Sequence, residues 1–401
     1  MAAAMDSSQY TLYVKADGSC PWCDKAAALL AGAGVPHTVV PVASTADIPH
    51  VVASATFPQC VEHLSGTCVV LGGYEALCDR LDEPLLAPNP LRFTLFPIKY
   101  PDLFGMYRKA LASFWTPQEI SLADDVQDWS TRLTEDDRTF VKHVLAFFAG
   151  SDGIVMENLA ANFAQEVQVP EARQFYASQM LMEAVHSESY SLLIDALASP
   201  AEALGLFRAI ETMEPVRKKA AWAQRYLDPR RRFAERLVAF VCVEGILFSG
   251  SFCAIYWLKR RGVMPGLCLA NEFISRDEAL HYQFGVALYG HLRHALPEAA
   301  VRRIVQDAVE TELDFVVDAI PCRLVGMNAA LMQQYIKFVA DRAMVDLGCA
   351  KIYGVDNPFP WMELISLAGK SNFFERFPSE YQRAGVMAGA DEQVFGTDAD
   401  F

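Results

Sequence analysis

Glu183-Ala-Val-His186 and Glu278-Ala-Leu-His281 are two Glu-x-x-His steps, and each lies inside a long apolar stretch with the composition of a helix. Positions three apart share one face of a helix, so each step can direct a carboxylate and an imidazole at one metal ion. One such pair alone would be a weak indication. Two pairs predict a dinuclear metal site inside a four-helix bundle, provided that two further helices each supply an inward carboxylate.

Asp152 and Glu244 are the carboxylates that we expect from those further helices, because each interrupts an apolar run. The resulting four carboxylates and two imidazoles form a hard donor set that suits iron or manganese. Four negative charges also balance two divalent ions, which makes their burial tolerable. Alternatively, Glu183 and Glu278 are solvated surface groups, but the apolar neighbours of Glu183 argue against this interpretation.

The composition indicates a large buried core and excludes some functions. The chain has 401 residues, of which 52% are hydrophobic and 21% are charged. Its formal net charge of -15 disfavours nucleic-acid binding, because phosphates require a basic face. The first residues show no basic region followed by a long apolar segment, and the ten cysteines lack the even spacing of a disulfide framework. We therefore expect a cytoplasmic protein with mostly reduced thiols.

One segment, 237–258, is long enough to cross a bilayer, and basic residues flank it on both sides. It contains Glu244, however, and a carboxylate inside a membrane is costly without a partner. A helix that is apolar all round is also what the centre of a large bundle requires. We therefore predict a buried core helix and no membrane span.

The chain is predicted to contain four regions. They are a small α/β domain (9–85), a linker with an N-terminal arm (86–124), an all-α bundle (125–350) and a C-terminal region with a flexible tail (351–401). In the bundle, the apolar pattern predicts helices over 137–168, 170–198, 201–226, 230–260, 266–293, 297–321 and 329–350. Prolines lie near several of these starts, where a helix tolerates them.

Tyr190 lies one helical turn after His186 and on the same face. A phenol beside a dinuclear metal site could be oxidised when the metals react with oxygen. The radical would need a dry wall around it, because water and reductants quench radicals. Three apolar residues on the metal side of their helices could form that wall, namely Phe248, Phe252 and Ile274. On spacing alone, ordinary core packing is the better explanation of these side chains.

Four stretches of this sequence resemble the small subunit of class I ribonucleotide reductase, of the eukaryotic type. They are Val144–Val155 (VLAFFAGSDGIV), Glu183–Ile194 (EAVHSESYSLLI), Val243–Phe252 (VEGILFSGSF) and Ile274–His281 (ISRDEALH). The resemblance covers about residues 90–401. It implies a ferritin-like fold, two iron ions per chain (manganese shares the same ligands) and a stable tyrosyl radical on Tyr190. The implied metal ligands are Asp152, Glu183, His186, Glu244, Glu278 and His281.

The resemblance also implies a route for the radical. Trp115 and Asp277 match the pair that joins His186 to the subunit surface. Tyr381 matches the tail tyrosine that hands the radical to the large subunit, and the closing segment Phe395–Phe401 resembles the peptide that docks there. The ribonucleoside diphosphate substrate would bind the large subunit, and the small subunit would form a homodimer.

The region 9–85 carries a second chemical motif. Cys20-Pro-Trp-Cys23 lies between a predicted strand, Tyr10–Val14, and a predicted helix, Lys25–Ala31. Further strands are predicted at Pro36–Val42 and Thr67–Leu71. Because a helix N-terminus lowers the pKa of a thiol, we expect Cys20 to be the attacking thiolate and Cys23 the resolving thiol. Half of a zinc site is the alternative, but a second Cys-x-x-Cys to complete it is missing from the sequence.

Thr56-Phe57-Pro58 and Gly72-Gly73 follow the cysteines at suitable distances. Together with the cysteines they are similar to a glutaredoxin, in which that proline is cis and faces the active-site thiols. The resemblance implies a thioredoxin-like fold for this domain and glutathione as its ligand, held by Thr56, Phe57, Pro58, Gly72 and Gly73.

The sequence therefore predicts a natural fusion of a glutaredoxin-like domain with a radical-generating reductase subunit. A di-iron oxygenase acting on its own small substrate would use the same six ligands. It would not need Trp115, Tyr381 or the tail Phe395–Phe401, and their joint presence favours the reductase. Two further hypotheses are an iron-storage bundle with a redox appendage and a membrane di-iron protein.

Overall fold

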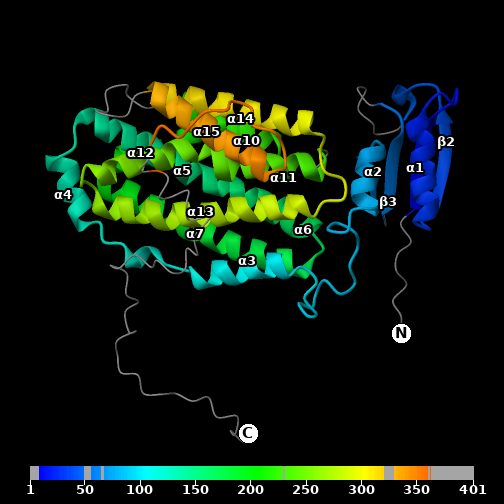
Figure 1. The fold of residues 1–401 in the computed structure, drawn as a ribbon, viewed down its shortest axis with the longest axis horizontal. Helices are drawn as coiled ribbons and strands as arrows, with labels where there is room; N and C mark the ends of the chain where they lie inside the picture. Colours follow the sequence, from blue (N-terminus) through cyan, green and yellow to red (C-terminus); the bar gives the residue numbers. More distant parts are fainter. Residues whose placement is uncertain are drawn as a thin grey trace, which may run out of the picture. The chain divides into compact units, whose positions relative to one another are not determined.

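The computed structural model of the chain describes residues 9–48, 56–64, 67–228, 231–319, 329–359 and 362. The chain forms two compact units, Met1–Asp356 and Asn357–Phe401. Nearly all described residues belong to the first unit, in which a small sheet precedes a large set of helices in the chain (Figure 1). The predicted sites at Tyr381 and Phe395–Phe401 lie outside the described residues.

Four strands form a mixed sheet in the order β2-β1-β3-β4, with β1 parallel to β2 and antiparallel to β3. The elements are β1 (Gln9–Lys15), α1 (Pro21–Gly32), β2 (His37–Val42), β3 (Gln59–Leu64), β4 (Thr67–Gly72) and α2 (Tyr74–Leu81), with a short turn η1 (Thr45–Asp47). Tyr10 and Leu12 of β1 pack with Ala26, Leu30 and Leu77 of the two helices in a buried core. The sequence predicted β1, β2 and β4 to within one residue but missed β3 and α2.

After α2, most of the described residues lie in helices. These helices are α3 (Pro101–Ala112), α4 (Ala123–Thr131), α5 (Glu135–Asn158), α6 (Ala164–Glu166), α7 (Pro170–Leu197), α8 (Pro200–Phe207), α9 (Ala209–Thr212), α10 (Glu214–Arg225), α11 (Phe233–Cys242), α12 (Ser249–Arg260), α13 (Pro265–Gly290), α14 (Glu298–Ala319) and α15 (Ala329–Asp346), with a short turn η2 (Pro117–Glu119). A capping box of Thr134 and Asp137 begins α5, while α7 and α13 begin with a proline.

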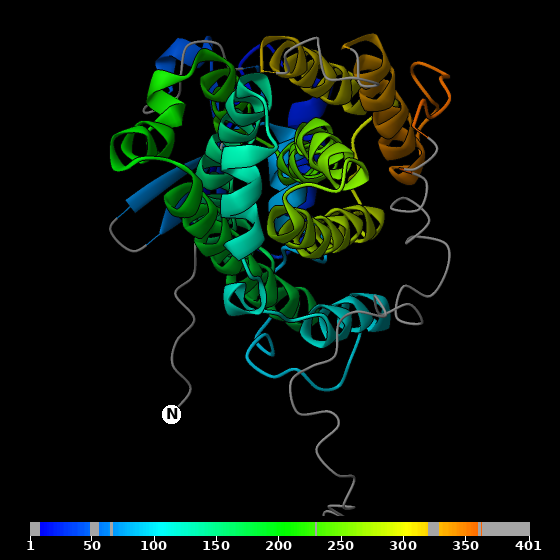
Figure 2. The ribbon, with the colours of Figure 1, turned by 90° about the vertical axis from the view of Figure 1, so that its left-hand side faces the viewer.

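The bundle consists of α5, α7, α13 and the continuous run from α11 to α12, which pack against one another (Figure 2). Figure 2 looks along these helices. The helix α3 packs against α7 and α13, although only an arm and a linker were predicted for its region. This helix is short, and its proline-rich flank concealed it.

Three of the predicted helices are interrupted. The expected helix 201–226 is divided into α8, α9 and α10, and Pro215 stands in the first turn of α10, where proline is tolerated. Two π-helical turns, η3 (Leu159–Phe163) and η4 (Val243–Leu247), interrupt the other two. A π-helical turn adds one residue to the helix, so side chains on its two sides do not follow one α-helical face.

Two helical runs are long and apolar enough to cross a membrane by length and composition, Glu135–Glu166 and Phe233–Arg260. The second contains the segment 237–258 that the sequence singled out, and 94% of its most apolar window is buried inside the protein. Both are core helices of the bundle, and the buried interior accounts for their apolar character.

Candidate metal centre and redox groups

Six side chains meet inside the bundle, at the positions that the sequence singled out. They come from α5 (Asp152), α7 (Glu183 and His186), η4 (Glu244) and α13 (Glu278 and His281). Each is at most 3% exposed. A group of four carboxylates this deeply buried requires compensating positive charge, since an isolated buried carboxylate would neutralise instead.

The six residues form two overlapping groups whose potential ligand atoms lie within 4.8 Å of one another. One group is Asp152, Glu183 and His186, and the other is Glu183, Glu244, Glu278 and His281. Glu183 belongs to both groups. Within the centre, His186 Nδ1 lies 3.1 Å from Glu278 Oε1, and His281 Nδ1 lies 3.1 Å from Glu183 Oε1.

The charges in the centre are unbalanced without cations. Burial, together with repulsion from Glu183, raises the pKa of Asp152 well above its usual value, and burial and Glu278 do the same to the pKa of Glu244. Asp152 Oδ2, Glu183 Oε2 and Glu244 Oε2 are buried acceptors without a hydrogen-bond partner among the described residues. Orphaned carboxylate oxygens beside imidazoles are the donor set of a hard divalent ion, so the centre fits two such ions.

Gln179 is a member of this centre that the sequence analysis missed. It lies on α7 one turn before Glu183, and its Nε2 donates to Glu244 Oε1 at 3.1 Å and to Glu183 Oε1 at 3.4 Å. The amide thus connects a carboxylate of α7 to the carboxylate of η4. Its i−4 spacing from Glu183 was the available signal, because that spacing places both residues on one helix face.

Tyr190 is buried beside the centre, in an aromatic enclosure. Its ring stacks on Phe148 of α5, with centroids 4.7 Å apart and planes 9° apart. Phe148 in turn contacts Phe248 and Phe252, with centroids 5.8 and 5.0 Å away. Two of the predicted wall residues therefore reach Tyr190 through Phe148, which the sequence analysis did not single out. Ile274, the third, is fully buried on α13. Burial and the nearby Asp152 raise the pKa of Tyr190 well above its usual value.

A chain of polar contacts leads from the centre to Trp115. The indole Nε1 of Trp115 donates to Asp277 Oδ2 at 2.7 Å, and the same oxygen lies 3.3 Å from His186 Nε2. The rings of Trp115 and His186 are also stacked, with centroids 6.1 Å apart. Arg276 contacts the other oxygen of Asp277 at 3.2 Å. The structure thus brings together the three residues that the resemblance placed on one route.

Beside the sheet, Cys20 is the N-cap residue of α1, without a side-chain capping hydrogen bond, and Cys23 lies buried in the first turn of that helix. Burial and a hydrogen bond with Cys20 raise the pKa of Cys23 to about 11. The raised pKa keeps Cys23 in its thiol form at neutral pH.

The motifs Thr56–Pro58 and Gly72–Gly73 contact each other, and Tyr74, which follows Gly73, contacts Trp22 of the Cys20–Cys23 turn. The ring of Trp22 contacts Tyr74, the first residue of α2, with centroids 5.5 Å apart. A Cβ atom on Gly73 would lie 3.6 Å from the carbonyl oxygen of Pro58. The Phe57–Pro58 peptide bond is cis, and Thr56 is exposed. Gly72 has a φ of +108°, which favours glycine at that position.

The metal-free protein is expected to lose stability as the pH rises from about 6.5 to 9. Although burial opposes it, Glu278 and Glu183 raise the pKa of His281 to about 9. A raised histidine pKa gives stability that is fully present below its unfolded value of about 6.5 and is lost as the pH passes the folded value. The raised pKa values of Asp152 and Glu244 act in the same direction.

Thermal unfolding in a chelator at three pH values checks this prediction. The melting temperature should fall across the interval by several degrees, and His281→Gln should flatten the slope. A melting temperature that rises with pH would contradict it.

Residues 92–358 match the family described as "Ribonucleotide reductase, small chain". The sequence is 59% identical to the ribonucleoside-diphosphate reductase small chain of Nicotiana tabacum over 308 residues, which cover 77% of this chain and 93% of that protein. It is 55% identical to the human ribonucleoside-diphosphate reductase subunit M2 over 322 residues, which cover 80% of this chain and 82% of that protein. The structure resembles that of the Rnr4 homodimer from Saccharomyces cerevisiae, with a TM-score of 0.66 and 37% identity over 74% of this chain and 93% of that one.

Proposed function

The chain belongs to the ribonucleotide reductase small-chain family, and we propose that it forms and stores a tyrosyl radical on Tyr190 for deoxyribonucleotide synthesis. The observation that carries the proposal is the placement of a buried phenol beside a buried centre of four carboxylates and two imidazoles. A ferritin-like storage bundle would need the ligands but would not need the aromatic enclosure of Tyr190 or the contacts that lead to Trp115.

Two iron ions would be held by the two overlapping groups of ligands; manganese fits the same donors. When bound, the ions would allow oxygen to act as the oxidant that removes one electron from the phenol of Tyr190. The protein contributes the surroundings. Phe148, Phe248 and Phe252 exclude water from the ring of Tyr190. The pKa of Tyr190 is raised well above its usual value, so the hydroxyl is protonated at neutral pH, and forming the neutral radical removes both an electron and that proton.

His186, Asp277 and Trp115 would carry the radical toward the surface, since their contacts form one continuous path. Tyr381 would continue the path, and Phe395–Phe401 would dock on the large catalytic subunit, which binds the ribonucleoside diphosphate. Homodimer formation is supported by the relationship to the Rnr4 homodimer. We place the protein in the cytoplasm.

Loading the metal-free protein with ferrous iron and admitting oxygen tests the proposed function. Two bound ions per chain, a tyrosyl signal in low-temperature electron paramagnetic resonance, and ribonucleotide reduction on adding the large subunit are the expected results. A di-iron oxygenase would bind two ions but consume oxygen with its own substrate and form no stable tyrosyl radical. An organic radical signal that appears only with manganese would change our assignment of the metal but not the proposed function.

We further propose that residues 9–85 form a thioredoxin-like, glutaredoxin-type domain that uses glutathione. The mixed sheet, the position of Cys20 at the start of α1 and the buried Cys23 support this assignment. Residues 86–124 would connect the domain to the bundle at 125–350, and 351–401 would carry the docking tail. The domain would return electrons to the cysteines of the large subunit, which each turnover oxidises.

Replacing Cys20 with serine is expected to lower glutathione-driven turnover of the assembled enzyme by at least about tenfold, because serine cannot attack a disulfide. Turnover driven by dithiothreitol should be unchanged, since that reductant does not need the domain. Cys68→Ser is the matched control, as Cys68 is an exposed thiol of the same domain outside the motif. Equal glutathione-driven rates in the parent and Cys20→Ser would remove the proposed role.

A further inference from the structure

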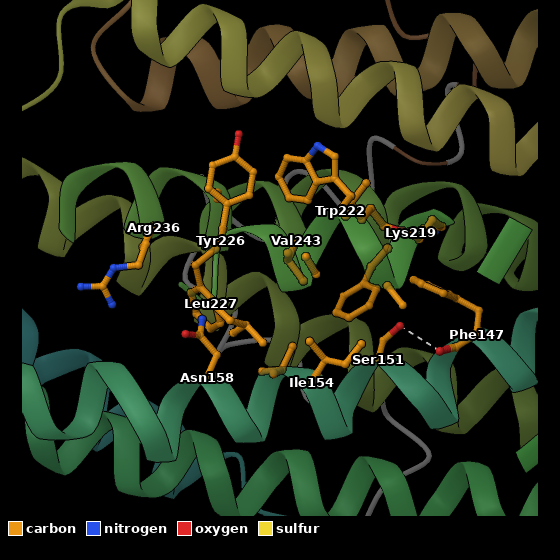
Figure 3. A pocket seen from close by; sticks show the side chains of 17 residues that line it. Phe147, Ser151, Ile154, Asn158, Lys219, Trp222, Tyr226, Leu227, Arg236 and Val243 are labelled. Carbon is orange, nitrogen blue, oxygen red and sulfur yellow. Dashed lines mark hydrogen bonds between the residues drawn. The ribbon is translucent and has the colours of Figure 1, made fainter. Parts of the chain in front are cut away.

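Lys219 and Glu312 form a buried ion pair that the proposed chemistry does not use. Lys219 lies on α10 and Glu312 on α14, and their side chains are 1% and 0% exposed. The ammonium Nζ lies 2.6 Å from Glu312 Oε2 and sits between the rings of Phe147 and Phe315, 3.5 and 3.8 Å from their centroids. Lys219 also lines a cavity with Phe147 and Val243 (Figure 3).

Burial disfavours the charged forms of both partners of this pair. Burial lowers the pKa of Lys219 to about 8 and raises the pKa of Glu312 to about 7, so both groups are held against the preference of the site for neutral forms. Buried ion pairs often contribute less to stability than apolar residues of the same volume, and in some proteins they fix one arrangement of the chain. The arrangement that this pair fixes can be read from its backbone contacts.

Both partners bind the backbone where η4 gives way to α12. Lys219 Nζ donates to the carbonyl oxygen of Leu247, the last residue of η4. Glu312 Oε1 accepts from the amide of Gly250, in the first turn of α12, at 3.2 Å. At a change from π-helical to α-helical spacing, backbone groups lose regular partners along the helix. The ion pair binds one carbonyl and one amide at this junction.

Gly250 lets the side chains of Glu312 and Val316 approach the backbone closely at this junction. A Cβ atom on Gly250 would lie 2.6 Å from Glu312 Oε1, closer than real contacts permit. The carboxylate therefore rests directly on the backbone. Glu244 lies three residues before Leu247, within η4, and Phe248 lies between the two clamped residues. The backbone that the pair grips is thus the backbone that presents a carboxylate to the metal centre and an aromatic ring to Phe148.

We propose that Lys219 and Glu312 are positioning residues that clamp the junction of η4 and α12, and so hold Glu244 in place to bind metal. The role of Glu244 as a metal ligand rests on the proposed function. The existence of the clamp rests on the backbone contacts alone. Loss of the clamp should weaken metal binding at the group containing Glu244 and leave the fold intact.

The test compares two double variants on the same pair of helices. Lys219→Met with Glu312→Leu removes the clamp and keeps the buried volume. Arg225→Met with Asp307→Leu is the matched control, because this pair also joins α10 to α14, at 3.1 Å, but is 49% and 37% exposed and does not touch the junction. If the clamp variant does not fold, Gly250→Ala replaces it, since the added methyl group displaces Glu312 from the backbone side.

The first readout is amide hydrogen exchange in the metal-free protein. Exchange at Gly250 and its neighbours should be at least about tenfold faster in the clamp variant than in the control. The second is a Mn²⁺ titration followed by electron paramagnetic resonance, in which the signal of a coupled ion pair should require about tenfold more Mn²⁺. In a Glu244→Gln background the clamp substitutions should cause no further loss, because the positioned residue is already altered.

Parental exchange and parental Mn²⁺ binding in a folded clamp variant would overturn the inference, as would a full further loss in the Glu244→Gln background. A parent protein that binds no pair of ions would instead overturn the proposed function. Hydrogen exchange at Gly250 would then still decide whether the clamp exists.

Discussion

Tyr190→Phe is expected to abolish the tyrosyl signal and to reduce ribonucleotide reduction to the background of the assay, while both metal ions remain bound. Phenylalanine keeps the ring that stacks on Phe148, so the packing of the enclosure is preserved. It lacks the hydroxyl group, and without a proton to release the ring is far harder to oxidise. Losing an obligatory redox group removes the reaction step and does not merely slow it. Iron content, the paramagnetic signal and turnover with the large subunit, measured on one preparation, check the result.

Tyr176→Phe is the matched control for this prediction. Tyr176 lies on the same helix, α7, is fully buried, and has a hydroxyl without a hydrogen-bond partner among the described residues. Its ring stacks on Phe163, in the same manner as Tyr190 stacks on Phe148. The control should keep the parental signal and turnover. If the tyrosyl signal survives in Tyr190→Phe and disappears in Tyr176→Phe, the radical forms on Tyr176, and our assignment to Tyr190 is wrong.

The grouping of six side chains at the candidate metal centre could be predicted from the sequence because its information is local. Each Glu-x-x-His step fixes two ligands on one helix face, whatever the rest of the fold does. Asp152 and Glu244 could be found because a charged residue within an apolar run is rarely buried without a partner. The structure brings these six side chains together without any change to the predicted set.

The surroundings of the centre could not be predicted in the same way. Nothing in the apolar stretch around Glu244 marks the extra residue of η4, because the sequence there suits α-helical and π-helical spacing equally well. Phe148 reaches Tyr190 from another helix, so no spacing within α7 reveals it. Lys219 and Glu312 lie far apart along the chain. In a sequence, two charged residues that will form a buried pair cannot be told from two exposed ones, because burial depends on how the helices pack.

Trp115→Phe is expected to leave the radical intact and to reduce turnover with the large subunit to background. The indole N–H donates to Asp277 Oδ2 at 2.7 Å, and phenylalanine has no group that can replace it. Asp277 would keep its contacts to His186 and to Arg276, so the metal ligand stays oriented and the centre can still load. The loss would therefore fall on transfer and not on radical formation. The radical yield after iron loading and the turnover rate measure the two steps separately.

Trp222→Phe is the control that separates loss of the radical path from loss of packing around a buried tryptophan. Trp222 is as deeply buried as Trp115, but its Nε1 has no hydrogen-bond partner among the described residues, and it lies on α10 away from the His186–Asp277 contact. It should lower turnover only as far as it lowers folded protein. Asp277→Asn should resemble Trp115→Phe, because the amide weakens the contact from the other side. Parental turnover in Trp115→Phe would show that the radical leaves by another route, and a joint loss of radical and turnover would show that Trp115 maintains the centre itself.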